Sequence, residues 1–536
     1  MANKRKALGW SAAALAPAAM LAALMTSDPS KLEANVEDVN PGPSVERDLC
    51  LTVALPGGAS ECGDLRLAHA LPAVRTLNQA RAPVLLYNSE HASPHPIIAA
   101  NIRLPSRAGL RRVVATLKVE GTPRAQSVWK GSAWPDTGIV RIALGYDAAG
   151  DRTRAYRYTL EVTAHYLTGT SSDTARGQLA VVNRRESRFG AGWWMAGVEQ
   201  LVLDPAGDPA LWVGGDGSTR RYTAARGDSV WGAPSLDRPD TLKRMANGWV
   251  RLLPGGTRVE FDSGGRHVAT TNRLHQKTDF WYGSQDRLDS IGVPPAVTRE
   301  GDMVYATPQR VIRPFVLAYD AGNRLVEVAS PGIGATGRVT VLHRSGARVD
   351  SITDLDGTRV RFGYASAEAV RITSRTDRRK YRTDFRYDAG WSIAASRLDL
   401  SALDSIVTHL HAGRSVGLVA DDGRGAVAVA DAYAWLDGPR TDVSDTTKLW
   451  LDHRGAPAKI VDAVGRVTRV FRENDAYPAL PTRVITPSGF TRRAEYDARG
   501  RLVRSIGENG LGNGRSDTTR YVYGDPLWPD FFTRVV

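Results

Sequence analysis

The stretch YDARGRL, at residues 496–502, joins the end of one strand to the start of another through a tight turn. Asp497 can bond its own backbone where the turn begins, and Gly500 supplies the positive φ that a tight reversal needs. The next strand then begins at Arg501. A chain that repeats such a stretch is strongly constrained, because each copy forms a two-stranded hairpin that cannot bury its apolar face alone.

Related stretches recur along the C-terminal two thirds of the chain, about ten residues apart within a block. The expected turn residues are Tyr319, Asp320, Gly322 and Arg324; Asp356 and Gly357; Tyr387 and Asp388; Asp452 and Gly455; Asp462 and Gly465; and Tyr496, Asp497, Gly500 and Arg501. The stretches GDGSTRRY at 215–222 and GGTRVEF at 255–261 repeat half of the unit. We predict stacked hairpins that share one continuous sheet. Between neighbouring turns, aspartates and arginines such as Asp497 and Arg501 are expected to form ladders of charge pairs.

Strict alternation of apolar and polar residues indicates a different β region before the repeats. In YRYTLEVTAHY, residues 156–166, apolar and aromatic residues alternate with polar ones over the whole stretch, which is typical of a half-buried strand. The predicted organisation is a small β region at 49–107, a β-sandwich-like domain at 108–182, a lead-in segment with degenerate repeats at 183–300 and repeats at 301–536. The best helical candidate is ASRLDLSALDSIVTHLHAG, at residues 395–413, although its pattern also fits strands.

The N-terminus has the pattern of an export signal. Lys4, Arg5 and Lys6 precede an apolar run at residues 7–25. Residues 1–27 are therefore expected to be an export signal or an uncleaved anchor, and the Pro- and Gly-punctuated residues 28–48 a linker. Export to the outside or to the cell envelope favours a disulfide between the two cysteines, Cys50 and Cys62. Two free thiols in a reducing compartment are the alternative.

The Tyr-Asp-x-x-Gly-Arg-Leu unit resembles the YD repeats of the Rhs family, which is related to the β-shells of insecticidal toxin complexes and teneurins. The stretch at 189–222, which begins FGAGWWMAGVEQ, resembles the segment that precedes such repeats in bacterial members. The resemblance covers about two thirds of the chain. It implies an all-β fold in which a β-sandwich-like region is followed by a YD-repeat sheet forming part of a spiral shell.

In function, the resemblance implies a non-enzymatic, exported shell that encloses or presents a C-terminal toxin or a separate partner chain. Family shells have more repeats and end in Asp-Pro-x-Gly signatures, which this chain does not show after its repeats. We therefore expect the chain to be either a β-shell protein itself or the N-terminal portion of one, and any toxin activity to lie beyond it. The alternative is a surface module that binds carbohydrate or a partner through aromatic residues, with Trp193, Trp194, Trp212, Trp281 and Tyr282 as candidates.

Other sequence features argue against cofactor, metal and nucleic-acid sites. GIGATG at 332–337 is followed by the strand-like RVTVLH, whereas a dinucleotide-binding loop needs a helix there. Asp354 and Asp356 form only a fragment of a calcium loop. The net charge of +13 comes from arginines scattered along the chain, so we expect no nucleic-acid partner. No motif for nucleophilic catalysis was found, and an enzyme would need a convergent pair of carboxylates in a cleft.

Overall fold

The structure is a computed structural model. It describes residues 52–536 except 56, 62, 77–78, 104–106, 134–138, 206–208, 225–229, 233–239, 294–296, 301–302, 307–311, 331–337, 389–391, 402–403, 412–433, 452–456, 475, 478–479, 509–515, 527–528 and 530. The predicted export segment and linker, together with Cys50, Cys62, Asp452 and Gly455, lie outside the described residues. Among those described, no helix has the length and apolar character needed to cross a bilayer.

The first described unit is a five-stranded antiparallel sheet whose last strand comes from a distant part of the chain. Its strands, in spatial order, are β1 (Thr52–Leu55), β2 (Gly58–Glu61), β3 (Asp64–Ala70), β6 (Val84–Asn88) and β13 (Trp193–Met195). The short pair β4 (Val74–Thr76) and β5 (Gln79–Arg81) lies beside it in sequence. The side chain of Asn88 caps the four-residue helix α3 (Ser89–Ala92) by accepting hydrogen bonds from two backbone amides.

The second unit is the predicted β-sandwich-like region. Its four-stranded sheet runs in the order β12 (Thr170–Val181), β11 (Arg154–Tyr166), β8 (Leu110–Val119) and β9 (Thr122–Lys130), and η1 (Gly131–Ala133) follows β9. This sheet shares one apolar core with the pair β7 (Ile97–Arg103) and β10 (Ile139–Gly145). Because β7 belongs to that core, the unit begins before residue 108, where the sequence placed its boundary. The alternation predicted for 156–166 is confirmed from Tyr156 to Ala164.

Two further sheets follow. A three-stranded sheet contains β14 (Gln200–Leu203), β15 (Pro209–Val213) and β16 (Thr219–Arg220). The described residues then form one 26-stranded antiparallel sheet, in chain order except that the separate hairpin β25 (Val297–Glu300) and β26 (Met303–Ala306) is left out. A short 3-10 turn, η2 (Ser284–Asp286), precedes the eighth strand. The predicted all-β fold of stacked hairpins is therefore confirmed.

The strands of this long sheet are β17 (Thr223–Ala224), β18 (Val230–Gly232), β19 (Thr241–Met245), β20 (Gly248–Leu252), β21 (Arg258–Asp262), β22 (His267–Thr271), β23 (Lys277–Tyr282), β24 (Leu288–Val293), β27 (Ile312–Tyr319), β28 (Leu325–Ser330), β29 (Arg338–Ser345), β30 (Arg348–Thr353), β31 (Arg359–Tyr364), β32 (Ile372–Thr376), β33 (Arg382–Tyr387), β34 (Ile393–Asp399), β35 (Ser405–His411), β36 (Ala434–Asp437), β37 (Thr447–Leu451), β38 (Pro457–Val461), β39 (Val467–Phe471), β40 (Arg483–Ile485), β41 (Thr491–Tyr496), β42 (Leu502–Glu508), β43 (Ser516–Val522) and β44 (Arg534–Val535). The helical candidate at 395–413 is wrong, because β34 and β35 pair there as strands.

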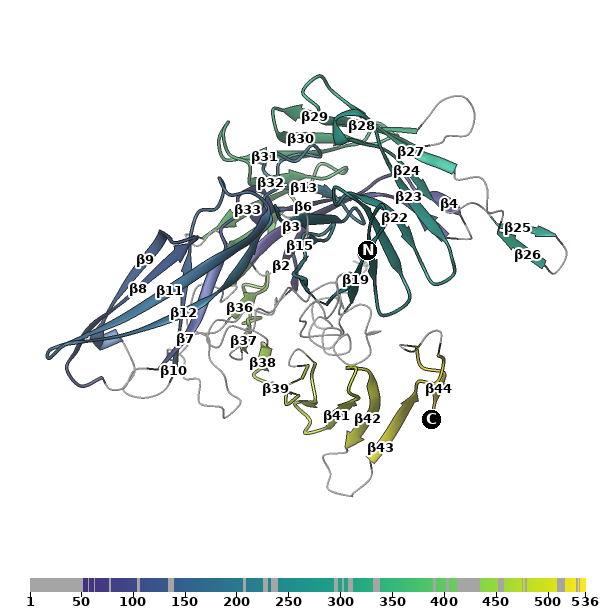
Figure 1. Ribbon diagram of the computed structural model, residues 1–536. Coiled ribbons are helices and arrows are strands. Elements are labelled where there is room, and N and C mark those ends of the chain that lie inside the picture. The colour runs from purple at the N-terminus through teal and green to yellow at the C-terminus, as the bar shows by residue number, and fades with distance from the viewer. Residues whose placement is uncertain are drawn as a thin grey trace, which may run out of the picture.

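Figure 1 shows the long sheet bending around the first unit. It runs from β19–β24 over β27–β33 at the top of the view, and continues through β36–β39 to β41–β44 at the bottom. Strands β2, β3, β6 and β13 lie inside this bend, and the β-sandwich-like unit projects to the left.

One apolar core joins the first unit to the middle of the long sheet. Trp193, on β13, is almost fully buried, and its ring packs against Tyr87 of β6 and Phe362 of β31, with centroids 5.4 and 5.1 Å apart. Buried residues from β23 to β35 complete the core. The five-stranded sheet therefore covers one face of the long sheet and is held there mainly by apolar burial.

The turns of the long sheet repeat one hydrogen-bond pattern. In the turn 497–501, the amide of Asp497 donates to the carbonyl of Arg501 and the amide of Gly500 donates to the carbonyl of Asp497, both at 3.0 Å. The register shifts where such a turn meets the strands, as between Glu495 and Tyr496. This is a three-residue hairpin loop with a bulge, in which the fourth turn residue has a positive φ.

Successive turns alternate between the two long edges of the sheet, because neighbouring strands are antiparallel. One edge carries the turns that follow a tyrosine, such as 320–324, 388–392 and 497–501, and we call it the clasped edge. The opposite edge carries turns such as 272–276, 354–358, 377–381, 462–466 and 486–490, and we call it the plain edge. The turn at Asp462 and Gly465 therefore has the same backbone as the turn at Asp497 but lies on the other edge.

Tyrosines connect neighbouring hairpins along the clasped edge. Each stands at or just after the end of a strand, and its hydroxyl donates to a backbone carbonyl at or near the start of the preceding strand of the sheet. The five pairs are Tyr319 to Leu288, Tyr364 to Val349, Tyr387 to Ile372, Tyr496 to Pro481 and Tyr523 to Leu502, at 2.8–2.9 Å. We call this contact the tyrosine clasp.

Candidate functional site

The aspartate and arginine of a repeat pair within one turn. The guanidinium of Arg501 donates to the carboxylate of its own Asp497 at 2.6 Å, and Arg466 does the same to Asp462. Asp497 and Arg501 therefore do not form the expected ladder with a neighbouring turn, although the pairs Arg266 with Asp286 and Arg378 with Asp354 do join neighbouring turns. Although burial acts in the opposite direction, hydrogen bonds from Arg501 and from backbone amides lower the pKa of Asp497.

Arginines of the clasped edge also contact neighbouring turns through tyrosine rings. Arg501 lies over the ring of Tyr523, 4.5 Å from its centroid, while the carbonyl of Leu502 accepts the clasp from the same tyrosine. The pairs Arg348 with Tyr364 and Arg371 with Tyr387 repeat this arrangement at 5.1 and 5.7 Å. Both residues of the Arg-Leu pair in one unit thus contact the tyrosine of a following unit, the arginine over its ring and the leucine through its backbone carbonyl.

Two predicted turn residues occupy other positions than expected. In the turn 320–324 the residue with positive φ is Asn323, at 62°, and not the preceding Gly322. The turn predicted at Asp356 and Gly357 begins at Asp354, whose backbone closes it. Asp356 accepts hydrogen bonds from Thr358 instead.

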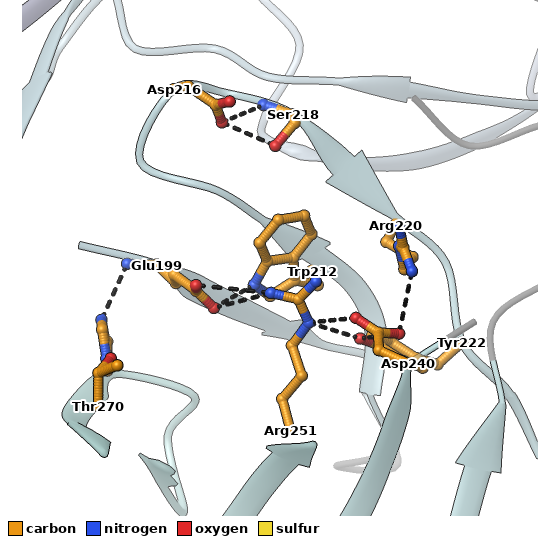
Figure 2. Close-up of polar contacts among 10 residues, drawn as sticks. Glu199, Trp212, Asp216, Ser218, Arg220, Tyr222, Asp240, Arg251 and Thr270 are labelled. Carbon is orange, nitrogen blue, oxygen red and sulfur yellow. Dashed lines mark hydrogen bonds and ion pairs between the residues drawn. The ribbon is translucent and has the colours of Figure 1, made fainter. Parts of the chain in front are cut away.

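A buried ion-pair cluster lies where the three-stranded sheet meets the start of the long sheet (Figure 2). Arg220 comes from β16, Asp240 precedes β19, Arg251 lies on β20, and Glu199 precedes β14. Arg251 donates through Nε to Asp240 and approaches Glu199 at 3.4 Å. Arg220 lies 3.3 Å from Asp240 on its other side.

Aromatic side chains complete the cluster. The hydroxyl of Tyr222 donates to Asp240 at 3.0 Å, and Trp212 donates through Nε1 to Glu199 at 2.6 Å. The guanidinium of Arg251 lies over the Trp212 ring, 3.8 Å from its centroid. Two arginines and two carboxylates therefore balance in charge, as buried ions require.

The electrostatics of the cluster stabilise its charged state. Burial alone disfavours the cation of Arg251, but Tyr222, Glu199 and Asp240 outweigh burial and raise its pKa. Nearby, burial lowers the pKa of His267, whose Nδ1 accepts a hydrogen bond from the amide of Glu199. A neutral imidazole is consistent with that accepting role.

Glu199 and Asp240 line a cavity of about 330 Å³ together with Trp212 and Arg220. A pair of carboxylates in a cleft is the arrangement that glycoside hydrolysis uses. Here, however, both carboxylates accept hydrogen bonds from Arg251, and Arg220 approaches one of them. Carboxylates whose oxygens already accept from arginines and from Trp212 or Tyr222 are poorly placed to exchange a proton with a substrate.

Four of the five aromatic residues proposed for carbohydrate binding fall into two groups, and the fifth, Trp281, is half-buried on β23. Trp193 and Trp212 are buried, with 1% and 8% of their surface exposed, and belong to apolar cores. Trp194 and Tyr282 are half-buried and line a larger cavity of about 840 Å³. One face of each ring is covered by an arginine, Arg184 over Trp194 and Arg266 over Tyr282.

This larger cavity lies between the β-sandwich-like unit, the lead-in segment and the clasped edge. The residues that sequence reasoning missed there are Arg184, Arg185 and Arg188, which the stretch NRRESR at 183–188 contributes. The three closely spaced arginines were a signal that could have found them, although the sequence does not show which of them face a cavity.

Comparisons with known proteins found likeness only among solved structures. No family model matches the chain, and no curated protein does. The chain is similar to a complex of TcdB2, TccC3 and Cdc42 at 12% identity and a TM-score of 0.30, over 80% of this chain and 22% of that one. It is also similar to the Photorhabdus luminescens Tc holotoxin pore, at 12% identity and a TM-score of 0.30, over 88% of this chain and 22% of the other.

A crystal structure of TcdB2-TccC3 gives the same identity and TM-score, over 88% of this chain and 26% of that chain. The chain thus spans about a quarter of the length of the structures it matches. Likeness at these TM-scores is too low to support an argument about this chain, and the resemblance to the Rhs family stays a prediction from the repeat.

Proposed function

We propose that the chain is a non-enzymatic β-shell scaffold that is exported and forms part of a wall enclosing or presenting a toxin or another partner chain at the cell envelope. The observation that carries this proposal is the 26-stranded sheet in the described part of the chain, which bends around the first unit. A sheet of this length leaves only its terminal strands without a partner on one side, which suits a continuous wall.

The clasped edge supports a mechanical role. Each hairpin is bound to the one before it by ladder hydrogen bonds, and at many units also by a clasp tyrosine and an arginine over its ring. Such repeats stabilise one another as nearest neighbours, so a wall can be long without a large central core. The ion-paired carboxylates in the smaller cavity favour a structural role over catalysis.

The test is to isolate the native assembly from culture medium and envelope fractions and to expose it to protease. A second chain or segment that survives while the wall is folded, and is digested once urea unfolds it, is the expected result. An assembly that contains no other protected polypeptide would overturn the enclosing role. Turnover of a polysaccharide by the purified chain that is abolished in Glu199→Gln would overturn the non-enzymatic role.

The alternative function is a surface module that binds carbohydrate or a partner. The observation that favours it is the position of Trp194 and Tyr282 in the wall of the 840 Å³ cavity. Glycan binding measured on an array should then weaken in Trp194→Ala and Tyr282→Ala. Binding that is unchanged in both variants would exclude this cavity as the carbohydrate site.

A further inference from the structure

The lead-in segment is held rigidly along the wall of the 840 Å³ cavity. The amide of Arg184 donates to the carbonyl of His91, and the amide of Gly192 donates to the carbonyl of Arg184, at 2.8 and 2.9 Å. The hydroxyl of Ser187 donates to the carbonyl of Trp193 at 2.7 Å. The amide of Ala191 reaches Ala347 in the turn between β29 and β30. The arginines of this segment therefore start from a fixed backbone.

Arg184 carries a buried positive charge. Its guanidinium donates to the carbonyls of Gly214 and Gly215 at 2.6 and 3.0 Å and lies 4.5 Å from the centre of the Trp194 ring. No carboxylate among the described residues lies within ion-pair distance of it. A buried cation that has only neutral partners is costly, and burial lowers the pKa of Arg184 to about 9.

The rest of the cavity wall has an excess of positive charge. Arg152, Arg185 and Arg188 also line it, and none of them forms an ion pair within the described part of the chain. The acidic wall residues Asp151, Glu199 and Asp286 already pair with Arg124, Arg251 and Arg266. Glu186 is the remaining acid. Four arginines thus face one unpaired carboxylate.

We propose that this cavity binds a small multivalent anion that carries carboxylate or phosphate groups. A guanidinium presents a planar fork of donors that matches both groups. The cavity has the volume typical of a small-molecule site and lies between packed units, where such sites are common. Arg185 and Arg188 are the principal ligands, and Arg184 supplies a fixed positive charge behind them.

A sugar is a poorer fit to this cavity than an anion. Binding of sugars by aromatic residues needs open ring faces, whereas arginines already cover one face of Trp194 and of Tyr282. A third ring in the wall, that of Tyr319, lies beneath Arg287 at 5.3 Å.

The test is calorimetric titration of the full chain with citrate and, separately, with pyrophosphate. The test variant is Arg185→Gln/Arg188→Gln. The matched control is Arg111→Gln/Arg112→Gln, which removes two exposed arginines of β8 and changes the net charge equally. Losing charge-assisted hydrogen bonds should weaken binding about tenfold or more in the test variant. The control should bind like the parent chain.

Saturable binding of citrate alone identifies the site as one for carboxylates, and binding of pyrophosphate alone identifies it as one for phosphates. Absence of binding of either anion at millimolar concentration would overturn the proposal. Equal weakening in both variants would also overturn it, because that result indicates general attraction to a basic surface. Thermal unfolding of the two variants without anion checks that both remain folded.

Discussion

The two long edges of the sheet use the same turn but connect their turns differently. On the clasped edge, Tyr387 closes the hairpin end by donating to Ile372 and lies beneath Arg371. On the plain edge, the turn 377–381 has the same backbone hydrogen bonds and ends at Tyr381, which is 41% exposed. An aromatic residue near a repeat turn therefore does not by itself make a clasp.

The plain edge depends on individual contacts. Arg378 reaches from one turn to Asp354 of the neighbouring turn at 2.5 Å, and the other carboxylate oxygen of Asp354 accepts from His69 of the first unit at 2.9 Å. Among the plain-edge turns that the structure describes, these contacts do not recur from hairpin to hairpin. The comparison indicates that the repeat residues connect neighbouring hairpins of the long sheet along one edge, while the other edge is available for contacts specific to this protein.

The largest difference between the edges is expected when a tyrosine is truncated. Tyr387→Ala removes a ring packed against the main core and the hydroxyl of a clasp, so it should lower the free energy of unfolding by about 3 kcal/mol. Tyr381→Ala is the matched change on the plain edge and should cost less than about 0.5 kcal/mol. Urea denaturation followed by tryptophan fluorescence measures both. Equal losses would show that the clasp does not distinguish the edges.

Glycines at the fourth turn position provide a second comparison. Gly465 on the plain edge and Gly500 on the clasped edge have φ values of 81° and 71°, and an alanine in this conformation costs about 1–2 kcal/mol. A Cβ at Gly465 meets no atom within 4 Å, whereas one at Gly500 lies 3.1 Å from the ring of Tyr477. Gly500→Ala should therefore be the more destabilising of the two in the same urea experiment. A larger loss for Gly465→Ala would contradict the crowding assigned to the clasped edge.

This contrast also shows how far the sequence could predict the structure. Gly500 and Gly465 were recognised correctly as turn residues, because a positive φ has a strong signature in residue type. Their assignment to opposite edges depends on how many strands separate them, and that count is hard to read from the sequence because β40, which lies between them, is only three residues long. The contacts of Arg501 were predicted wrongly, because Asp497 of its own turn and tyrosines or aspartates of neighbouring turns are all possible partners. The strand register, which the sequence does not show, brings Asp497 and Tyr523 to Arg501.

The cavity arginines were harder to predict than the turns. Arg184, Arg185 and Arg188 lie in a segment without regular alternation, and their position follows from hydrogen bonds to residues as distant as His91 and Ala347. The ion-pair cluster likewise joins Glu199, which precedes β14, to Arg251 on β20 of another sheet. Long-range packing of this kind has no local sequence signature, whereas turn chemistry does.

Acidification should weaken the plain edge through His69. Burial lowers the pKa of His69 below its ordinary value of 6.5, although Asp354 acts in the opposite direction. The unfolded chain therefore takes up the proton first, and stability is lost as the pH falls from about 7 through 6.5 toward the folded pKa, by about 1.4 kcal/mol per pKa unit.

In His69→Gln this part of the pH dependence should disappear, because an amide does not titrate but can still donate to Asp354. Urea midpoints of both proteins between pH 8 and 5 measure the difference. His267 and His95 also have pKa values lowered by burial, so the variant should retain a weaker dependence. A variant with the same pH dependence as the parent would show that His69 is not the titrating group of this edge.

The smallest effect is expected where a turn departs from glycine. Lys380 on the plain edge and Asn323 on the clasped edge hold the fourth turn position with φ values of 69° and 62°. Lysine is strained there, whereas asparagine tolerates this conformation. Lys380→Gly should raise the free energy of unfolding by about 0.5 kcal/mol, since relief of strain exceeds the entropy lost by glycine. Asn323→Gly should change it less. Equal gains in the two variants would contradict this prediction, because they would show that lysine is no more strained than asparagine at this turn position.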